Sequence, residues 1–280
     1  MTPLIKVENL SKTYTKRESL FSKSSFCALQ PVSFTLEPQT TLAIVGETGS
    51  GKSTLAKLLV GAEMPTTGQV FLNGQSLLAG KLKHRCKHIR MIFQDSGTTL
   101  NPSLTIGQLL DEPLKLNTKY NIKERDTIIR ETLQKVGLLP EHMNFYPHMF
   151  SGGQKQRISL ARAIILQPQL VILDEALASL DPSLRSQMIN LLLDLQEKLG
   201  LTYILISHNI GIVRHFSDKM MVLNHGRVVE FGSTESILRN PKHKYTQRLI
   251  QIQKFQMIKK YAPLKNNKKK GAIKLLFYSY

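Results

Sequence analysis

A glycine-rich loop between an apolar run and a helical pattern is the part of this sequence best suited to bind phosphate. Residues 41–45 predict a buried parallel strand, and the pattern from Ser53 to Val60 predicts a helix that ends near Gly61. Small residues in the loop let backbone N–H groups approach phosphate oxygens, and the helix N-terminus adds its dipole. The predicted phosphate-binding residues are Gly46, Glu47, Thr48, Gly49, Ser50, Gly51, Lys52, Ser53 and Thr54.

The end of this loop carries the side chains that a nucleotide triphosphate needs. Lys52 is placed to neutralise the β- and γ-phosphates, Ser53 offers a hydroxyl to Mg²⁺, and Thr54 can contact the α-phosphate region. A chance glycine-rich turn is the alternative. The strand before the loop and the helix after it favour the phosphate-binding interpretation.

Two carboxylates, Asp174 and Glu175, end a second apolar strand at residues 170–174. At the carboxyl edge of a parallel sheet they would face the ligand crevice. Asp174 is expected to hold Mg²⁺, usually through water, and Glu175 to orient and deprotonate the attacking water. The alternative is a helix cap with no catalytic role.

A third short stretch, Ser151–Gln154, stands at the start of a helix predicted from about Gly153 to Leu166. A serine hydroxyl and free N–H groups at a helix start form an anion site. Since the loop at residues 46–53 already completes one such site, a second makes sense if it serves phosphate bound to another subunit. Its residues are Ser151, Gly152, Gly153 and Gln154.

The elements that must position these residues alternate between strands and helices, which predicts a mainly parallel sheet covered by helices. A helical section from about Thr105 to Leu166 separates the two halves of this pattern. Further strands are expected at 4–10, 32–36, 69–73, 89–93, 202–206, 219–224 and 227–230, and further helices at 124–136, 182–198, 209–216 and 243–258.

The order and spacing of the phosphate loop, Ser151–Gln154 and Asp174–Glu175 resemble the ATP-binding subunit of an ATP-binding-cassette (ABC) transporter over roughly residues 4–250. The resemblance implies an α/β fold, a P-loop NTPase (RecA-like) core with an N-terminal antiparallel β region and an inserted α-helical subdomain at about 95–165. The ABC domain would span 1–250 and a basic tail 251–280. ATP and Mg²⁺ are the implied cofactors, and ATP hydrolysis is the implied reaction.

The same resemblance assigns roles to residues that mean little alone. Gln94 matches the glutamine that contacts Mg²⁺ or the lytic water, and His208 matches the histidine that reaches the γ-phosphate. Tyr14 matches the aromatic residue that stacks on adenine, with core packing as the alternative. Asp181, after Ser179 and Leu180, matches the loop that crosses the dimer interface.

Several stretches resemble the dipeptide/oligopeptide class, among them the run His243–Leu249, and residues 174–181 are most similar to the F-type ATPase of Sap (sensitivity to antimicrobial peptides) transporters. The class implies two transmembrane permease subunits, a second ABC ATPase and, indirectly, a periplasmic substrate-binding protein. Three residues depart from the usual pattern: Met149 replaces Glu, Ala176 replaces Pro and Asn209 replaces Asp.

The chain is strongly basic, with a formal net charge of +18, but lysines in residues 254–280 supply eight of these charges. We therefore expect no nucleic-acid partner, although a soluble ABC ATPase acting on nucleic acid or ribosomes is a rival, as is a module that binds ATP without turnover. A polyamine or another cation is the rival substrate to peptide.

The N-terminus lacks the pattern of a signal peptide. No apolar run approaches the length of about 18 residues that is needed to cross a bilayer. This predicts a peripheral subunit at the cytoplasmic face of the inner membrane. Two cysteines fit a reducing compartment. His84, Cys86 and His88 would share a face on a strand and could bind metal, but we favour a solvated basic loop.

Overall fold

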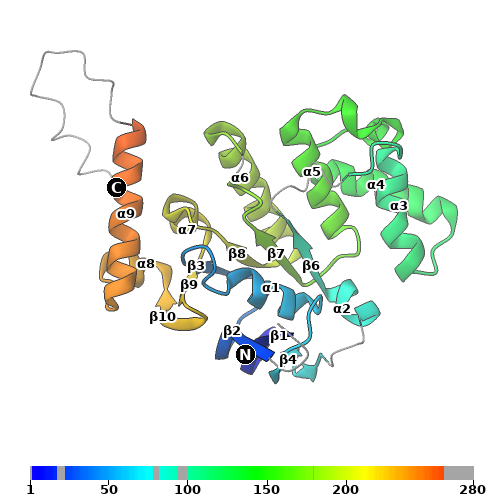
Figure 1. Cartoon of the computed structure of the whole chain (residues 1–280). Coiled ribbons are helices and arrows are strands. Elements are labelled where there is room, and N and C mark those ends of the chain that lie inside the picture. The colour runs from blue at the N-terminus through cyan, green and yellow to red at the C-terminus, as the bar shows by residue number, and fades with distance from the viewer. Residues whose placement is uncertain (1, 18–22, 78–81, 94–99, 179, 262–280) are drawn as a thin grey trace, which may run out of the picture.

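The computed structural model describes residues 2–17, 23–77, 82–93, 100–178 and 180–261. Its main sheet has the strand order β10-β9-β3-β8-β7-β6 (Figure 1). The strands from β9 to β6 run parallel, and β10 pairs with β9 in the antiparallel direction. The bounds are β3 (Thr41–Val45), β6 (Ile89–Ile92), β7 (Leu170–Asp174), β8 (Thr202–Ile206), β9 (Lys219–Asn224) and β10 (Arg227–Ser233).

Alternate residues of the parallel strands enter two separate hydrophobic cores. Along β3, Ala43 and Val45 belong to one core, whereas Leu42 and Ile44 belong to the other. This period of two is the expected geometry of a strand buried on both faces, and it explains why β3 and β8 are buried along their whole length. The first core packs against α6 (Pro182–Leu199) and α7 (Ile210–Phe216).

The second core lies between the main sheet and an antiparallel sheet of order β2-β1-β4-β5, with α1 (Lys52–Val60) inside it. The strands are β1 (Ile5–Arg17), β2 (Lys23–Leu36), β4 (Thr67–Leu72) and β5 (Gln75–Ser76). Leu55 and Leu59 of α1 are fully buried in this core. The antiparallel sheet therefore fixes the position of the helix that follows the glycine-rich loop.

A group of helices is inserted between β6 and β7 and lies at one end of the molecule (Figure 1). It consists of α3 (Ile106–Asn117), α4 (Ile122–Lys135), the 3₁₀ turns η1 (Pro140–Asn144) and η2 (Pro147–Met149), and α5 (Gly152–Ile164). At the other end lie α8 (Thr234–Arg239) and α9 (Lys244–Tyr261). Helix α9 crosses residue 250, where the sequence suggested that the domain ends.

Most expected strands and helices occur within a few residues of their predicted bounds, but β1 runs on to Arg17 and β2 begins at Lys23, well outside the expected 4–10 and 32–36, and β5 and α8 were not predicted. One expected element is of the wrong type. The segment that contains His84, Cys86 and His88 is helix α2 (Leu82–His88), neither a strand nor a loop. Successive residues of a helix are rotated by about 100°, so alternate positions do not share a face. The described residues hold no cluster of three or more metal-ligating side chains, and none of the described helices is long and apolar enough to cross a membrane.

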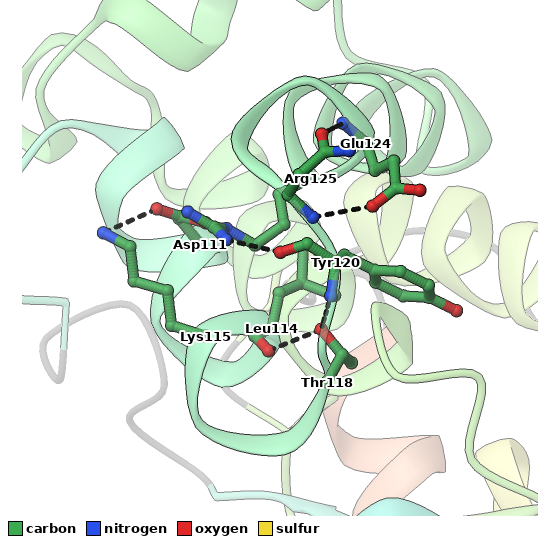
Figure 2. A network of polar contacts seen from close by, with 8 residues as sticks. Asp111, Leu114, Lys115, Thr118, Tyr120, Glu124 and Arg125 are labelled. Carbon is green, nitrogen blue, oxygen red and sulfur yellow. Dashed lines mark hydrogen bonds and ion pairs between the residues drawn. The ribbon is translucent and has the colours of Figure 1, made fainter.

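The corner between α3 and α4 is fixed by a network centred on Asp111 (Figure 2). Its carboxylate accepts from Lys115 Nζ at 2.8 Å and from Arg125 Nε at 2.6 Å. Arg125 Nη1 also donates to the carbonyl of Tyr120 at 2.7 Å. Burial alone would raise the pKa of Asp111, but the hydrogen bonds from Lys115 and Arg125 bring it below its usual range.

We expect Asp111→Asn to lower the free energy of unfolding at pH 7 by about 1 kcal/mol, because a charged hydrogen-bonded pair is lost. A lowered native pKa stabilises the fold above the unfolded pKa of about 4 and ceases to do so as the pH falls through the native value. Urea unfolding measures this free energy, and the difference between Asp111→Asn and wild type should therefore disappear in acid.

Asp126→Asn is the matched control, since Asp126 pairs with Arg130 on the exposed surface of α4. Its effect should stay below about 0.5 kcal/mol. Equal effects of the two substitutions at pH 7, or a difference from wild type that does not shrink as the pH falls below the unfolded pKa of about 4, would contradict this account of the corner.

Candidate functional site

The loop between β3 and α1 adopts backbone conformations that favour glycine. Gly46 and Gly51 have φ values of +153° and +102°, and Gly51 is the N-cap of α1 without a side-chain cap. A Cβ on Gly51 would lie 2.6 Å from the carbonyl oxygen of Ala28 in β2, and one on Gly46 would lie 2.2 Å from that of Leu223 in β9. The loop thus packs directly on two strands, and the first N–H groups of α1 can face an anion.

Lys52 places a largely buried ammonium group under this loop. Lys52 is only 7% exposed, and its Nζ donates to the carbonyl oxygens of Gly46 and Glu47 at 2.9 Å and 2.7 Å. Burial lowers the pKa of Lys52, whereas the negative charges of Glu175 and Asp174 oppose that change. A positive charge with so little water around it interacts strongly with phosphate.

Ser53 and Asp174 bring a hydroxyl and a carboxylate together where α1 meets the end of β7. The Ser53 hydroxyl donates a hydrogen bond to the Asp174 carboxylate. Burial raises the pKa of Asp174, while that hydrogen bond and the charge of Lys52 work against the increase. Hydroxyl and carboxylate oxygens are the ligands that Mg²⁺ prefers, so the donor set fits this metal.

Glu175 and His208 meet at the ends of two neighbouring parallel strands, β7 and β8. Glu175 has a left-handed φ of +51°, and its N–H donates to the carbonyl of Ile206 at 3.0 Å. Its Oε1 lies 3.2 Å from Nδ1 of His208. Strained backbone of this kind is concentrated at functional sites. The two side chains lie within hydrogen-bonding distance of each other, and Glu175 is close enough to Lys52 of the phosphate loop to act on its charge.

Helix caps fix the loops that follow these strands. Asn209 Oδ1 accepts from the N–H of Ile212 at 3.2 Å and begins α7, and Asp181 Oδ1 accepts from the N–H of Leu184 at 3.0 Å and begins α6. The departure at Asn209 thus retains the capping oxygen that an aspartate would supply. Ala176, another departure, is 3% exposed and packs in the core.

Arg185 holds the loop before α6, a role that the sequence analysis missed. Its Nε donates to the carbonyl of Leu177 at 3.1 Å, and its Nη2 donates to those of Leu180 at 2.7 Å and Ala178 at 3.4 Å. An arginine four residues after the capping Asp181 is the only local signal for this arrangement. Ser179 and the predicted metal contact Gln94 lie outside the described residues.

Tyr14 lies on the surface beside the phosphate loop, so the structure does not support the core-packing alternative. The residue is 38% exposed, its hydroxyl contacts Glu63 and Thr54, and Lys12 Nζ lies 5.0 Å from the centre of its ring. Phe26, which is 65% exposed, is its cross-strand partner in β2. Direct partners project to the same face, so Phe26 adds a second aromatic side chain that the sequence analysis did not include.

Ser151 begins α5 with a reciprocal capping box. Its Oγ accepts from the N–H of Gln154 at 3.3 Å, and Oε1 of Gln154 accepts from the N–H of Ser151 at 3.0 Å. Ser151 and Gly152 are exposed, whereas a Cβ on Gly153 would lie 3.0 Å from the side chain of Leu184. The start of α5 therefore packs against the first turn of α6, next to the loop that Asp181 caps.

Comparison with known proteins decides the family. The family model described as "ABC transporter" matches residues 29–178. The chain belongs to the ABC transporter family. The "Peptide transport system ATP-binding protein SapF" of Salmonella typhimurium is 52% identical to it over 247 residues, which cover 88% of this chain and 92% of that protein.

Two further proteins refine the comparison. The "Putrescine export system ATP-binding protein SapF" of Escherichia coli strain K12 is also 52% identical, with the same coverage. Among solved structures, the ATP-binding cassette MJ0796, a dimer bound to ADP and Pi after hydrolysis, has a TM-score of 0.71 and 28% identity, covering 82% of this chain and 98% of that one. This ABC ATPase thus has the expected P-loop NTPase core, N-terminal antiparallel β region and inserted helical subdomain, and it binds ATP.

Proposed function

We propose that this ABC ATPase drives peptide transport at the cytoplasmic face of the inner membrane. It would act with two permease subunits, a second ABC ATPase and, indirectly, a periplasmic substrate-binding protein. The observation that carries the proposal is the convergence of Lys52, Asp174, Glu175 and His208 at one edge of the sheet. The name of the Salmonella relative supports peptide as the substrate.

Lys52 and the N–H groups at the start of α1 would bind the β- and γ-phosphates, and Tyr14 would stack on adenine. Ser53 and Asp174 would hold Mg²⁺, as their donor set allows, with Gln94 as a further contact. Bound there, the metal would offset the negative charge of the phosphates. Thr54, whose hydroxyl meets that of Tyr14, would contact the α-phosphate region.

In the hydrolytic step, Glu175 would orient a water molecule and accept its proton while the water oxygen attacks the γ-phosphorus. The bond between the γ-phosphorus and the β–γ bridging oxygen breaks, which yields ADP and phosphate. His208, 3.2 Å from Glu175, would hold the carboxylate and reach the γ-phosphate. The left-handed backbone of Glu175 supports this assignment, since strained backbone is concentrated at functional sites.

Ser151–Gln154 would act on ATP bound to a second ATPase subunit, with Asp181 at the shared interface. The exposed start of α5 and its packing beside the Asp181 loop support this arrangement. The MJ0796 cassette is itself a dimer with ADP and Pi. Phe145, Tyr146 and Met149 are exposed apolar residues just before Ser151, which supports a permease contact there.

Glu175→Gln should reduce ATP hydrolysis by at least about 100-fold in the assembled transporter, because the amide cannot accept the proton. Binding of Mg-ATP should stay within about threefold of wild type. Glu141→Gln, an exposed carboxylate in η1, is the matched control and should hydrolyse ATP normally. Equal rates of ATP hydrolysis by wild type and Glu175→Gln would show that Glu175 is not the group that accepts the proton.

Putrescine is the second candidate substrate, because a relative of the same 52% identity is named for putrescine export. The test is to rebuild the transporter with its permeases and partner ATPase in vesicles and to measure ATP-dependent movement of labelled peptide and labelled putrescine. Peptide movement that stops in the Glu175→Gln variant is the expected result. Movement of putrescine without peptide would overturn the peptide assignment and leave the ATPase assignment intact.

A further inference from the structure

The C-terminal helix α9 reaches the phosphate loop through Tyr245. The backbone N–H of Glu47 donates a hydrogen bond to the Tyr245 hydroxyl at 3.0 Å, across 198 positions of sequence. The two residues belong to the loop before α1 and to the first turn of α9, respectively. This bond therefore links the nucleotide site to a helix that has no role in the site described above.

Tyr245 and Lys52 bind opposite ends of the same peptide group. The N–H of Glu47 and the carbonyl of Gly46 belong to one planar trans peptide unit, so they point in opposite directions. Tyr245 accepts from the N–H, and Lys52 Nζ donates to the carbonyl at 2.9 Å. Each hydrogen bond polarises the peptide in the sense that strengthens the other. The orientation of this peptide thus sets one of the hydrogen bonds that hold the Lys52 ammonium, together with those to the Glu47 carbonyl and the Ser50 hydroxyl.

A rigid frame holds Tyr245 in place. The two carboxylate oxygens of Glu230 in β10 accept from the N–H groups of Lys242 and His243 at 2.9 Å and 3.1 Å, just before α9. The N–H of Tyr245 donates to Nδ1 of His243 at 3.1 Å. The ring packs against the first core, and the following Thr246 is fully buried. The hydroxyl is therefore presented to the loop from a fixed position.

The hairpin that carries Glu230 contacts the loop at a second point. The N–H of Gly226, in the turn between β9 and β10, donates to the carbonyl of Ser50 at 3.0 Å. Burial raises the pKa of the Tyr245 phenol, so the hydroxyl stays protonated at neutral pH. The hairpin and α9 together hold the loop at Ser50 and at Glu47.

We propose that Tyr245 is a positioning residue for nucleotide binding: its hydroxyl fixes the Gly46–Glu47 peptide and thereby aims the Lys52 ammonium at the phosphates. The inference rests on the proposed role of Lys52. It adds α9 to the elements that set ATP affinity. Tyr245 lies in the run His243–Leu249, which resembles the dipeptide/oligopeptide class, so one residue of that run gains a physical role.

The test uses the full chain with Tyr245→Phe, which keeps the ring and removes the hydroxyl. We expect the Kd for Mg-ATP, measured by calorimetry, to rise about 3- to 10-fold, because the Gly46–Glu47 peptide is no longer oriented before the nucleotide binds and binding must then supply about the energy of one hydrogen bond. In the assembled transporter the KM for ATP should rise similarly, with kcat at saturating ATP within about twofold of wild type. Tyr120→Phe, on the surface of the helical subdomain, is the matched control and should change neither constant.

Unfolding without nucleotide separates positioning from general stability. Tyr245→Phe should have a free energy of unfolding no more than about 1 kcal/mol below that of Tyr120→Phe, the same range of about 3- to 10-fold in an equilibrium constant, because one intramolecular hydrogen bond is lost. Both variants should stay fully folded under the conditions of the titration. A Kd for Mg-ATP within twofold of wild type would overturn the inference. So would a smaller amount of folded protein whose affinity for Mg-ATP equals that of wild type. Wild type that fails to bind Mg-ATP would overturn the role of Lys52 as well. Normal binding by both wild type and Tyr245→Phe would overturn the role of Tyr245 alone.

Discussion

The buried ammonium group of Lys52 is the constraint on which the rest of the site depends. A buried cation without partners costs on the order of several kcal/mol. Here two loop carbonyls accept hydrogen bonds from it, and the carboxylates of Asp174 and Glu175 supply opposing charge. The loop must therefore fold tightly around Lys52, and β7 must end beside it. Glycines at the points of closest backbone approach make that fold possible.

This constraint extends well beyond the loop. The antiparallel sheet and the second core fix α1, and the hairpin between β9 and β10 supports the loop from the other side. Helix α9 completes the arrangement through Tyr245. The nucleotide site is thus held by elements from both ends of the chain, whereas the helical subdomain, which carries Ser151, shares the first core and lies at the end of the molecule away from α9 (Figure 1).

The sequence predicted the parts of this site whose signals are local. The strand, loop and helix around Lys52 are contiguous, and the carboxylates follow an apolar strand directly, so patterns of a few residues sufficed. The Tyr245 contact and the pairing of Phe26 with Tyr14 depend on tertiary packing or on strand register, which no local pattern encodes. The contacts of Arg185 reach back only five to eight residues, and its spacing from Asp181 is too weak a signal to predict them. The error at His84–His88 has a different cause, since a short polar segment can show a period of two by chance and still form a helix.

The most direct test of the account is calorimetric titration of the full chain with Mg-ATP and, separately, with adenosine, in wild type and Lys52→Ala. The account predicts that Lys52→Ala weakens ATP binding by at least about 100-fold, since the main cation that faces the phosphates is lost. Adenosine, which has no phosphate, should bind both proteins alike. Tight ATP binding by Lys52→Ala would contradict the central claim.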